Sequence, residues 1–161
     1  MPHPQVVPDE YVAALRAYLT GDPGYDELSQ RLADRDGDEG GNVYAALLGM
    51  TFLIAARRRF PTYTSADLIR FVARTRADTG PAGAGVDPQI AERTLRGALG
   101  EPSAIDGIAD ITRATAIMML LPALLTNDGA RLAELDALLA GARTQADRAL
   151  WARHGQTMDQ P

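Results

Sequence analysis

One uncharged, apolar stretch constrains the fold of this chain more than any other part of its sequence. Residues 43–56 read VYAALLGMTFLIAA, and only Gly49 and Thr51 interrupt the apolar run. A membrane-spanning helix needs about 20 apolar residues, so this run is too short to cross a bilayer. A helix that is apolar all round is usually buried on every side. We therefore predict a buried central helix at about 41–60, with the other helices packed around it.

The rest of the sequence also shows helical spacing of its apolar residues, and no segment alternates with the period of two typical of strands. Cap-and-proline starts such as Asp22-Pro23 and Asp87-Pro88 divide the chain into helices joined by short connections. Pro122 lies inside a second very apolar run, which it should kink or split. The predicted fold is all-α, a compact bundle of about seven helices.

The length of the chain indicates one domain, because 161 residues is close to the typical size of about 150. Residues 1–8 contain three prolines and nothing expected to anchor them, so we predict a disordered tail there. A single helical domain should follow over residues 9–153, with a frayed end at 154–161. The chain has no cysteine, which fits a reducing compartment, and we expect a cytoplasmic location.

Charge is distributed unevenly along the chain. The net charge is −5, yet residues 57–96 carry 8 arginines against 4 acidic residues. An acidic protein is a poor candidate for binding double-stranded nucleic acid, but a protein partner could read the basic segment. The candidate partner-binding residues are the arginines without an acidic neighbour at helical spacing: Arg57, Arg58, Arg59, Arg76 and Arg93. For residues 57–59 the alternative is structural, because arginines at the C-terminus of a helix also satisfy its last carbonyls.

A cluster of alternating acids gives the only suggestion of a metal site. Asp34, Asp36 and Asp38 have the spacing of calcium-loop ligands. The sixth position of that loop should be glycine and the twelfth glutamate, but the chain has glutamate and alanine there. We therefore interpret residues 34–42 as a solvated polar turn between helices and predict no metal site.

Patterns typical of enzyme sites are also missing from the sequence. His3 and His154 lie near the chain ends without carboxylates at ligand spacing, and no serine sits in a G-x-S-x-G motif. The glycine-rich residues 80–85 lack the lysine of a phosphate loop. We therefore predict neither catalytic residues nor a cofactor, which favours a non-enzymatic role.

The last predicted helix has a seam of leucines followed by alanines at alternating spacings of three and four. The seam consists of Leu132, Leu135, Leu139, Ala142, Ala146 and Ala149. Alanines allow close helix packing, and large aromatics such as Trp151 are enriched in interface cores. Ala142, Ala146, Ala149 and Trp151 are therefore our candidates for self-association as a homodimer. The alternative is that the seam packs inside one chain.

Two functions from different classes remain open on the sequence alone. The first is a non-catalytic interaction or regulatory module that binds another protein or itself, and no membrane. The second is a domain that holds a small apolar or anionic ligand in a pocket between the apolar helices, with or without enzymatic activity. Four tyrosines spread over the first three helices could line a pocket, although core packing is the commoner role. These are Tyr11, Tyr18, Tyr25 and Tyr44.

Overall fold

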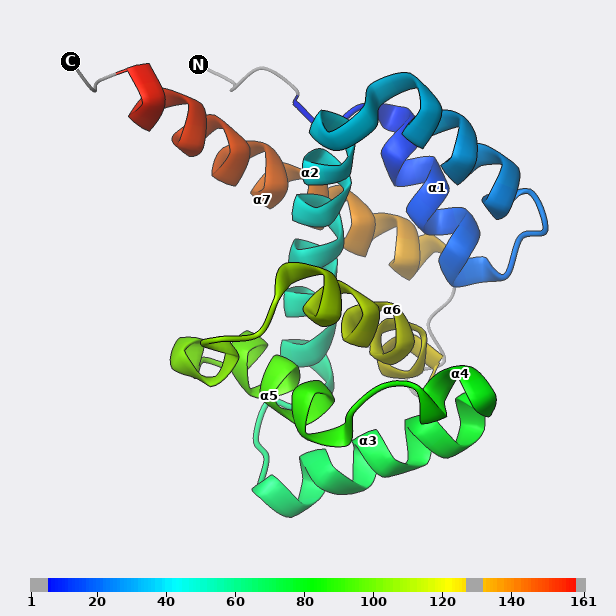
Figure 1. Cartoon of the computed structure of the whole chain (residues 1–161), viewed down its shortest axis with the longest axis vertical. Coiled ribbons are helices and arrows are strands. Elements are labelled where there is room, and N and C mark those ends of the chain that lie inside the picture. The colour runs from blue at the N-terminus through cyan, green and yellow to red at the C-terminus, as the bar shows by residue number, and fades with distance from the viewer. Residues whose placement is uncertain (1–5, 127–131, 159–161) are drawn as a thin grey trace. The chain divides into compact units, whose positions relative to one another are not determined.

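The computed structural model describes residues 6–126 and 132–158, and this part of the chain contains helices and no strand (Figure 1). The α-helices are α1 (Asp9–Thr20), α2 (Tyr25–Arg59), α3 (Ser65–Thr79), α4 (Pro81–Ala84), α5 (Pro88–Ala98), α6 (Asp110–Thr126) and α7 (Leu132–Met158). One short 3₁₀ helix, η1 (Pro102–Ile105), lies between α5 and α6. The prediction of an all-α fold with about seven helices is confirmed.

The chain divides into two compact units. The first comprises the described parts of Met1–Thr51 and Arg131–Pro161, and the second comprises those of Phe52–Ala130. α2 therefore contributes residues to both units. The expectation of one domain over residues 9–153 stays a prediction.

α2 is much longer than the predicted central helix. It joins the expected second helix, the polar segment 34–42 and the apolar run into one element that is kinked at Gly37. Gly37 has φ 55° and ψ −140°, a backbone conformation that is essentially restricted to glycine. The predicted turn over residues 34–42 is therefore too long. The change of direction occurs at Gly37 alone, and the acidic residues around it are helical.

The apolar run of α2 supplies core residues, but it is not buried on every side. Leu47, Leu48 and Phe52 are all buried, as predicted. Ala45 is exposed and Met50 is half-buried, so the predicted all-round burial is wrong. Among the described helices, α2 is also the one long and apolar enough to cross a membrane, a test that core helices of soluble proteins pass as well.

The first unit anchors the residues that precede α1. The backbone amides of Val6 and Val7 donate to one carboxylate oxygen of Asp147 on α7, at 2.9 and 2.7 Å. Arg143 donates to the Val7 carbonyl and pairs with Asp9 at the start of α1. Val7 is fully buried. The predicted disordered tail therefore does not extend to these two valines, and its earlier residues lie outside the described part of the chain.

α7 packs against α1 in the same unit. Four residues of the predicted seam are buried, and Leu138 and Leu150 join them: Leu135, Leu138, Leu139, Ala142, Ala146 and Leu150. The seam is wrong at its first residue, because Leu132 is 59% exposed, and Ala149 is half-buried. The helix continues to Met158, so the end that we expected to fray from residue 154 is helical that far.

In the second unit, α5 packs against α3, α6 and η1, and α3 contacts α4 and α6. Thr64 and Asp67 form a capping box at the start of α3, and Asp87 caps α5 as the sequence predicts. α6 is one helix that contains Pro122, so the split that we expected there as one outcome does not occur.

Candidate binding site

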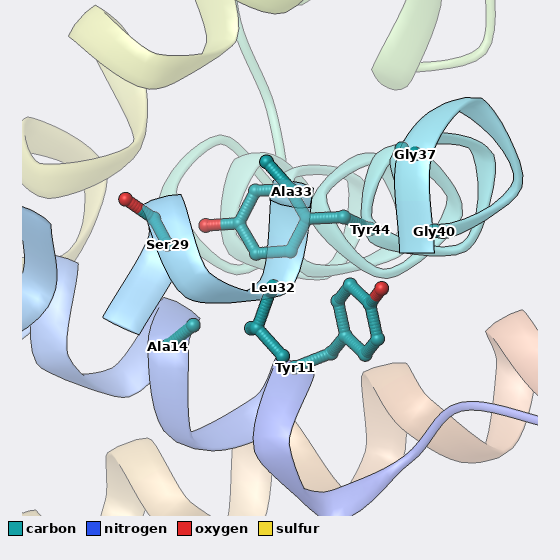
Figure 2. A pocket seen from close by; sticks show the side chains of 9 residues that line it. Tyr11, Ala14, Ser29, Leu32, Ala33, Gly37, Gly40 and Tyr44 are labelled. Atoms are coloured by element: carbon teal, nitrogen blue, oxygen red, sulfur yellow. The ribbon is translucent and has the colours of Figure 1, made fainter. Parts of the chain in front are cut away.

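A partly enclosed cavity of about 140 Å³ lies between α1 and the kinked part of α2, within the first unit (Figure 2). The residues that line it are small, apolar or hydroxyl-bearing, and none of them is charged. They are Tyr11, Ala14, Ser29, Leu32, Ala33, Gly37, Gly40, Gly41 and Tyr44.

Small residues on α2 create this space. Gly37, Gly40 and Gly41 follow one another along the helix at the kink, and none of them has a side chain to fill the gap toward α1. Tyr11 of α1 and Tyr44 of α2 stand beside the gap with their ring centroids 6.2 Å apart. The cavity is thus a space between two aromatic side chains and a glycine-rich turn of helix (Figure 2).

Tyr11 is held in place by a network of hydrogen bonds with residues next to the kink. Its hydroxyl donates to Asp36 at 2.6 Å, and the Arg35 guanidinium donates to both oxygens of the same carboxylate at 2.7 and 2.8 Å. Arg35 also pairs with Glu10. The hydrogen bonds from Arg35 and then Tyr11 hold the pKa of Asp36 at about 2. Burial, and then the bond to Asp36, raise the pKa of Tyr11 to about 12.

Gly40 is required for this position of Tyr11. A Cβ atom added at Gly40 would collide with the Tyr11 hydroxyl and with the side chain of Asp36. Gly40 leaves room for the Tyr11 ring, and the hydrogen bond to Asp36 holds it there. The Tyr11 side of the cavity is therefore preorganised.

Tyr44 differs from Tyr11 because its hydroxyl has no comparable partner. The oxygen is buried and lies near Tyr25, but it has no hydrogen bond as well aligned as that of Tyr11 with Asp36. Burial and then the nearby Tyr25 raise the pKa of Tyr44 well above its usual range. Figure 2 shows this hydroxyl pointing toward Ser29. The Ser29 hydroxyl itself donates to the Asp26 carbonyl at 3.1 Å.

Three of the five candidate arginines hold backbone carbonyls inside the second unit. Their Nε–H groups donate from Arg57 to Ala98, from Arg76 to Gly83 and from Arg93 to Ala104, at 3.1, 3.1 and 2.8 Å. These contacts are structural, but each is made to a carbonyl of another helix and not to the last carbonyls of the arginine's own helix. Arg59 lies 5.4 Å from the centre of the Phe60 ring, with its Nε buried. Arg58 is exposed.

Most of the alanines proposed for self-association pack against residues of the same chain. Ala142 and Ala146 are fully buried, and Ala149 is half-buried. The first two pack inside the single chain, and self-association through this helix stays a prediction. Trp151 is 46% exposed and remains accessible.

The acidic segment does not form a calcium loop. Asp36 is engaged by Arg35 and Tyr11, and Asp34 accepts a hydrogen bond from Gln30 at 2.8 Å. Over the described residues, no group of three or more histidine, aspartate or glutamate side chains is placed to hold a metal ion. His3 falls outside those residues.

The sequence indicates the tyrosines of this site but not its location. Tyr11 and Tyr44 were considered as pocket-lining residues, whereas the pocket itself was expected between the two most apolar runs. The signal that could have located it is the group of glycines directly before the apolar run, since closely spaced glycines on a helix face leave room beside it. No protein-family model, curated protein or solved structure matches the chain.

Proposed function

We propose that this protein is a non-catalytic helical module that binds a small molecule in the cavity between α1 and α2. The observation that supports this function is a partly enclosed cavity whose lining residues are all uncharged. Binding sites for small molecules typically have apolar walls and a few polar groups that orient the ligand.

The size of the cavity limits the ligand to a compact molecule. Its volume of about 140 Å³ is close to that of an engineered apolar cavity of about 150 Å³ that binds benzene. A single six-membered ring with one substituent is therefore the upper range of what the walls accept without movement.

The residues that line the cavity favour binding over catalysis. The one aliphatic hydroxyl among the lining residues belongs to Ser29, and it donates to a backbone carbonyl. No histidine or carboxylate lines the cavity to activate it as a nucleophile. The proposed module therefore retains or senses its ligand.

Binding of another protein or of a second copy stays a separate proposal. Among the residues suggested for it from the sequence, Arg57, Arg58 and Trp151 are exposed. The buried alanines and the three carbonyl-bound arginines support it less than the cavity supports a small ligand.

The proposed function is tested by titrating the full chain with benzene, toluene and phenol, followed by ligand-observed NMR and by thermal unfolding. A ligand that binds only the folded state raises its stability. Gly41→Leu should weaken binding at least tenfold, because a side chain at this lining position occupies the cavity. Gly141→Leu, at an exposed glycine of α7 with open space around it, is the matched control and should bind normally. Equal binding by the two variants, or no binding by the unmodified protein, would contradict the proposal.

A further inference from the structure

The start of α1 has no capping side chain of its own. The residue that precedes the helix is Pro8, and its side chain accepts no hydrogen bond from the first turn. The free amides at the start of a helix usually need such an acceptor, and helix stability falls without one. Tyr11, which lines the cavity, is the third residue of α1 and lies in this first turn. The position of Tyr11 therefore depends on what holds the start of α1 from outside.

α7 holds the start of α1 through the adjoining backbone. One carboxylate oxygen of Asp147 accepts hydrogen bonds from the amides of Val6 and Val7, at 2.9 and 2.7 Å. One turn earlier on α7, Arg143 donates to the Val7 carbonyl and pairs with Asp9, the first residue of α1. The Val7 side chain is fully buried. Residues 6–7 thus form a strap that is bound to α7.

α2 holds the same turn of α1 through other side chains. Glu10 pairs with Arg35, and the Tyr11 hydroxyl donates to Asp36 at 2.6 Å. The first turn of α1 therefore bridges α7 and the kinked part of α2. Without the bonds to α7, the bonds to α2 alone would have to order an uncapped turn. A binding site that is ordered before the ligand arrives binds more tightly, because less ordering has to occur on binding.

We propose that Arg143 and Asp147 are positioning residues of the cavity, which strengthen ligand binding although neither of them lines it. This inference rests on the proposed function. The two residues act through the strap and the first turn of α1, which carries Tyr11. Coupling between two sites is reciprocal, so a bound ligand should in turn stabilise the contact of the strap with α7.

The alternative is that these bonds stabilise the packing of α1 on α7 without any effect on the cavity. The same two helices make a second polar contact that provides a control. The Arg16 Nε lies 2.7 Å from a carboxylate oxygen of Asp136, and neither residue lines the cavity. Arg16 comes after the first turn of α1, so loss of this contact should leave Tyr11 in position.

The test measures phenol binding to the full-length protein and its variants by calorimetry. Phenol is neutral, which suits a wall without charged side chains, because burying an unpaired charge is costly. Asp147→Ala removes the acceptor of both strap amides, whereas Asp147→Asn keeps an oxygen that can accept from them. Asp136→Ala is the control for the second contact between α1 and α7. Circular dichroism confirms that each variant is folded before its binding is compared.

We expect Asp147→Ala to weaken phenol binding by about 5-fold or more, the lower end of typical coupling between sites. Asp147→Asn should weaken it less, because the conservative substitution restores part of the hydrogen bonding. Asp136→Ala should bind phenol as the unmodified protein does. A purely structural role would lower the stability of the Asp147 variants and leave the phenol affinity of the folded protein unchanged.

Hydrogen exchange on the unmodified protein tests the reciprocal effect and needs no variant. Saturating phenol should slow exchange at the Val6 and Val7 amides. The comparison is the Gln89 amide, which donates to Asp87 at 2.8 Å in the second unit and should exchange as before.

The positioning role is overturned, while the proposed function stands, if phenol binds but leaves exchange at the two strap amides unchanged. The same conclusion follows if Asp147→Ala binds phenol normally, or no more weakly than Asp136→Ala. If phenol does not bind the unmodified protein, the proposed function fails as well. Weaker binding by Asp147→Ala, recovered in part by Asp147→Asn, together with slower exchange in the strap, supports the inference.

Discussion

At the scale of single residues, hydrogen bonds from Tyr11 and Arg35 to Asp36 hold Tyr11 in its position beside the cavity. A carboxylate that accepts from both a tyrosine and an arginine restricts all three groups, because charge-assisted hydrogen bonds are shorter and stronger than neutral ones. The pKa of about 2 for Asp36 and that of about 12 for Tyr11 are consequences of the same geometry. These hydrogen bonds should therefore contribute measurably to the free energy of unfolding.

Tyr11→Phe should lower the free energy of unfolding by about 0.5–1.5 kcal/mol at neutral pH, because it removes one hydrogen bond to Asp36. Urea denaturation measures this change. Tyr18→Phe, a substitution of the same chemistry on the same helix, provides the comparison for loss of a tyrosine hydroxyl elsewhere on α1. A Tyr11→Phe protein as stable as the unmodified one would show that the bond contributes nothing.

The pH dependence of stability should have two windows. Asp36 has its pKa lowered by folding, so its contribution is complete above its unfolded value of 3.8 and is lost as the pH falls toward 2. Tyr11 has its pKa raised by folding from 10.0 to about 12, so the unfolded chain loses this proton first and stability declines as the pH rises between those values. In Tyr11→Phe the alkaline decline should be smaller. An identical pH profile for the two proteins would contradict the assignment.

At the scale of elements, the kink in α2 decides where the cavity lies. Gly37→Ala should destabilise the protein by about 1–3 kcal/mol, since φ 55° with ψ −140° is strained for any residue with a Cβ. Gly141→Ala is the matched substitution at an exposed helical glycine with open space around it, and it should stabilise by about 0.5–1 kcal/mol. Chemical denaturation of both variants gives the comparison, and a stabilised Gly37→Ala would show that the kink is not fixed by the backbone of this residue.

The inner face of α7 provides a second test at this scale. Ala146→Glu should destabilise by about 3–5 kcal/mol, because it places an unpaired charge in a fully buried position. Ala152→Glu, at an exposed position six residues later, should stay within about 0.5 kcal/mol of the unmodified protein. Thermal unfolding distinguishes the two. If Ala146→Glu left stability unchanged and altered only the sedimentation of the protein, Ala146 would belong to a contact between copies.

The sequence was informative about elements wherever local chemistry decides the structure. Thr64 and Asp87 cap the first turns of α3 and α5. Leu47 and Phe52 belong to the core because burial removes their apolar side chains from water. The anchoring of Val7 could not be predicted in the same way. It depends on contacts with α7, which is distant in sequence, and helical periodicity contains no information about such partners.

At the scale of the whole molecule, the candidate site belongs to one of two compact units. Its tyrosines were visible in the sequence, but the cavity was not, because its volume depends on which face of α2 meets α1 after the kink. The sequence places its most apolar segments correctly in helices, yet the unfilled space lies beside glycines and alanines. Cavities follow from residues that are too small to fill a gap, and such a gap exists only once two helices have packed.

The central claim, that a small neutral molecule binds between α1 and α2, is tested most directly by amide NMR of the full-length, ¹⁵N-labelled protein during a phenol titration. The account predicts saturable shifts at residues 11–14 and 29–44, with the amides of α3 and α5 unchanged. Shifts confined to the second unit, or none up to the solubility limit of phenol, would contradict it.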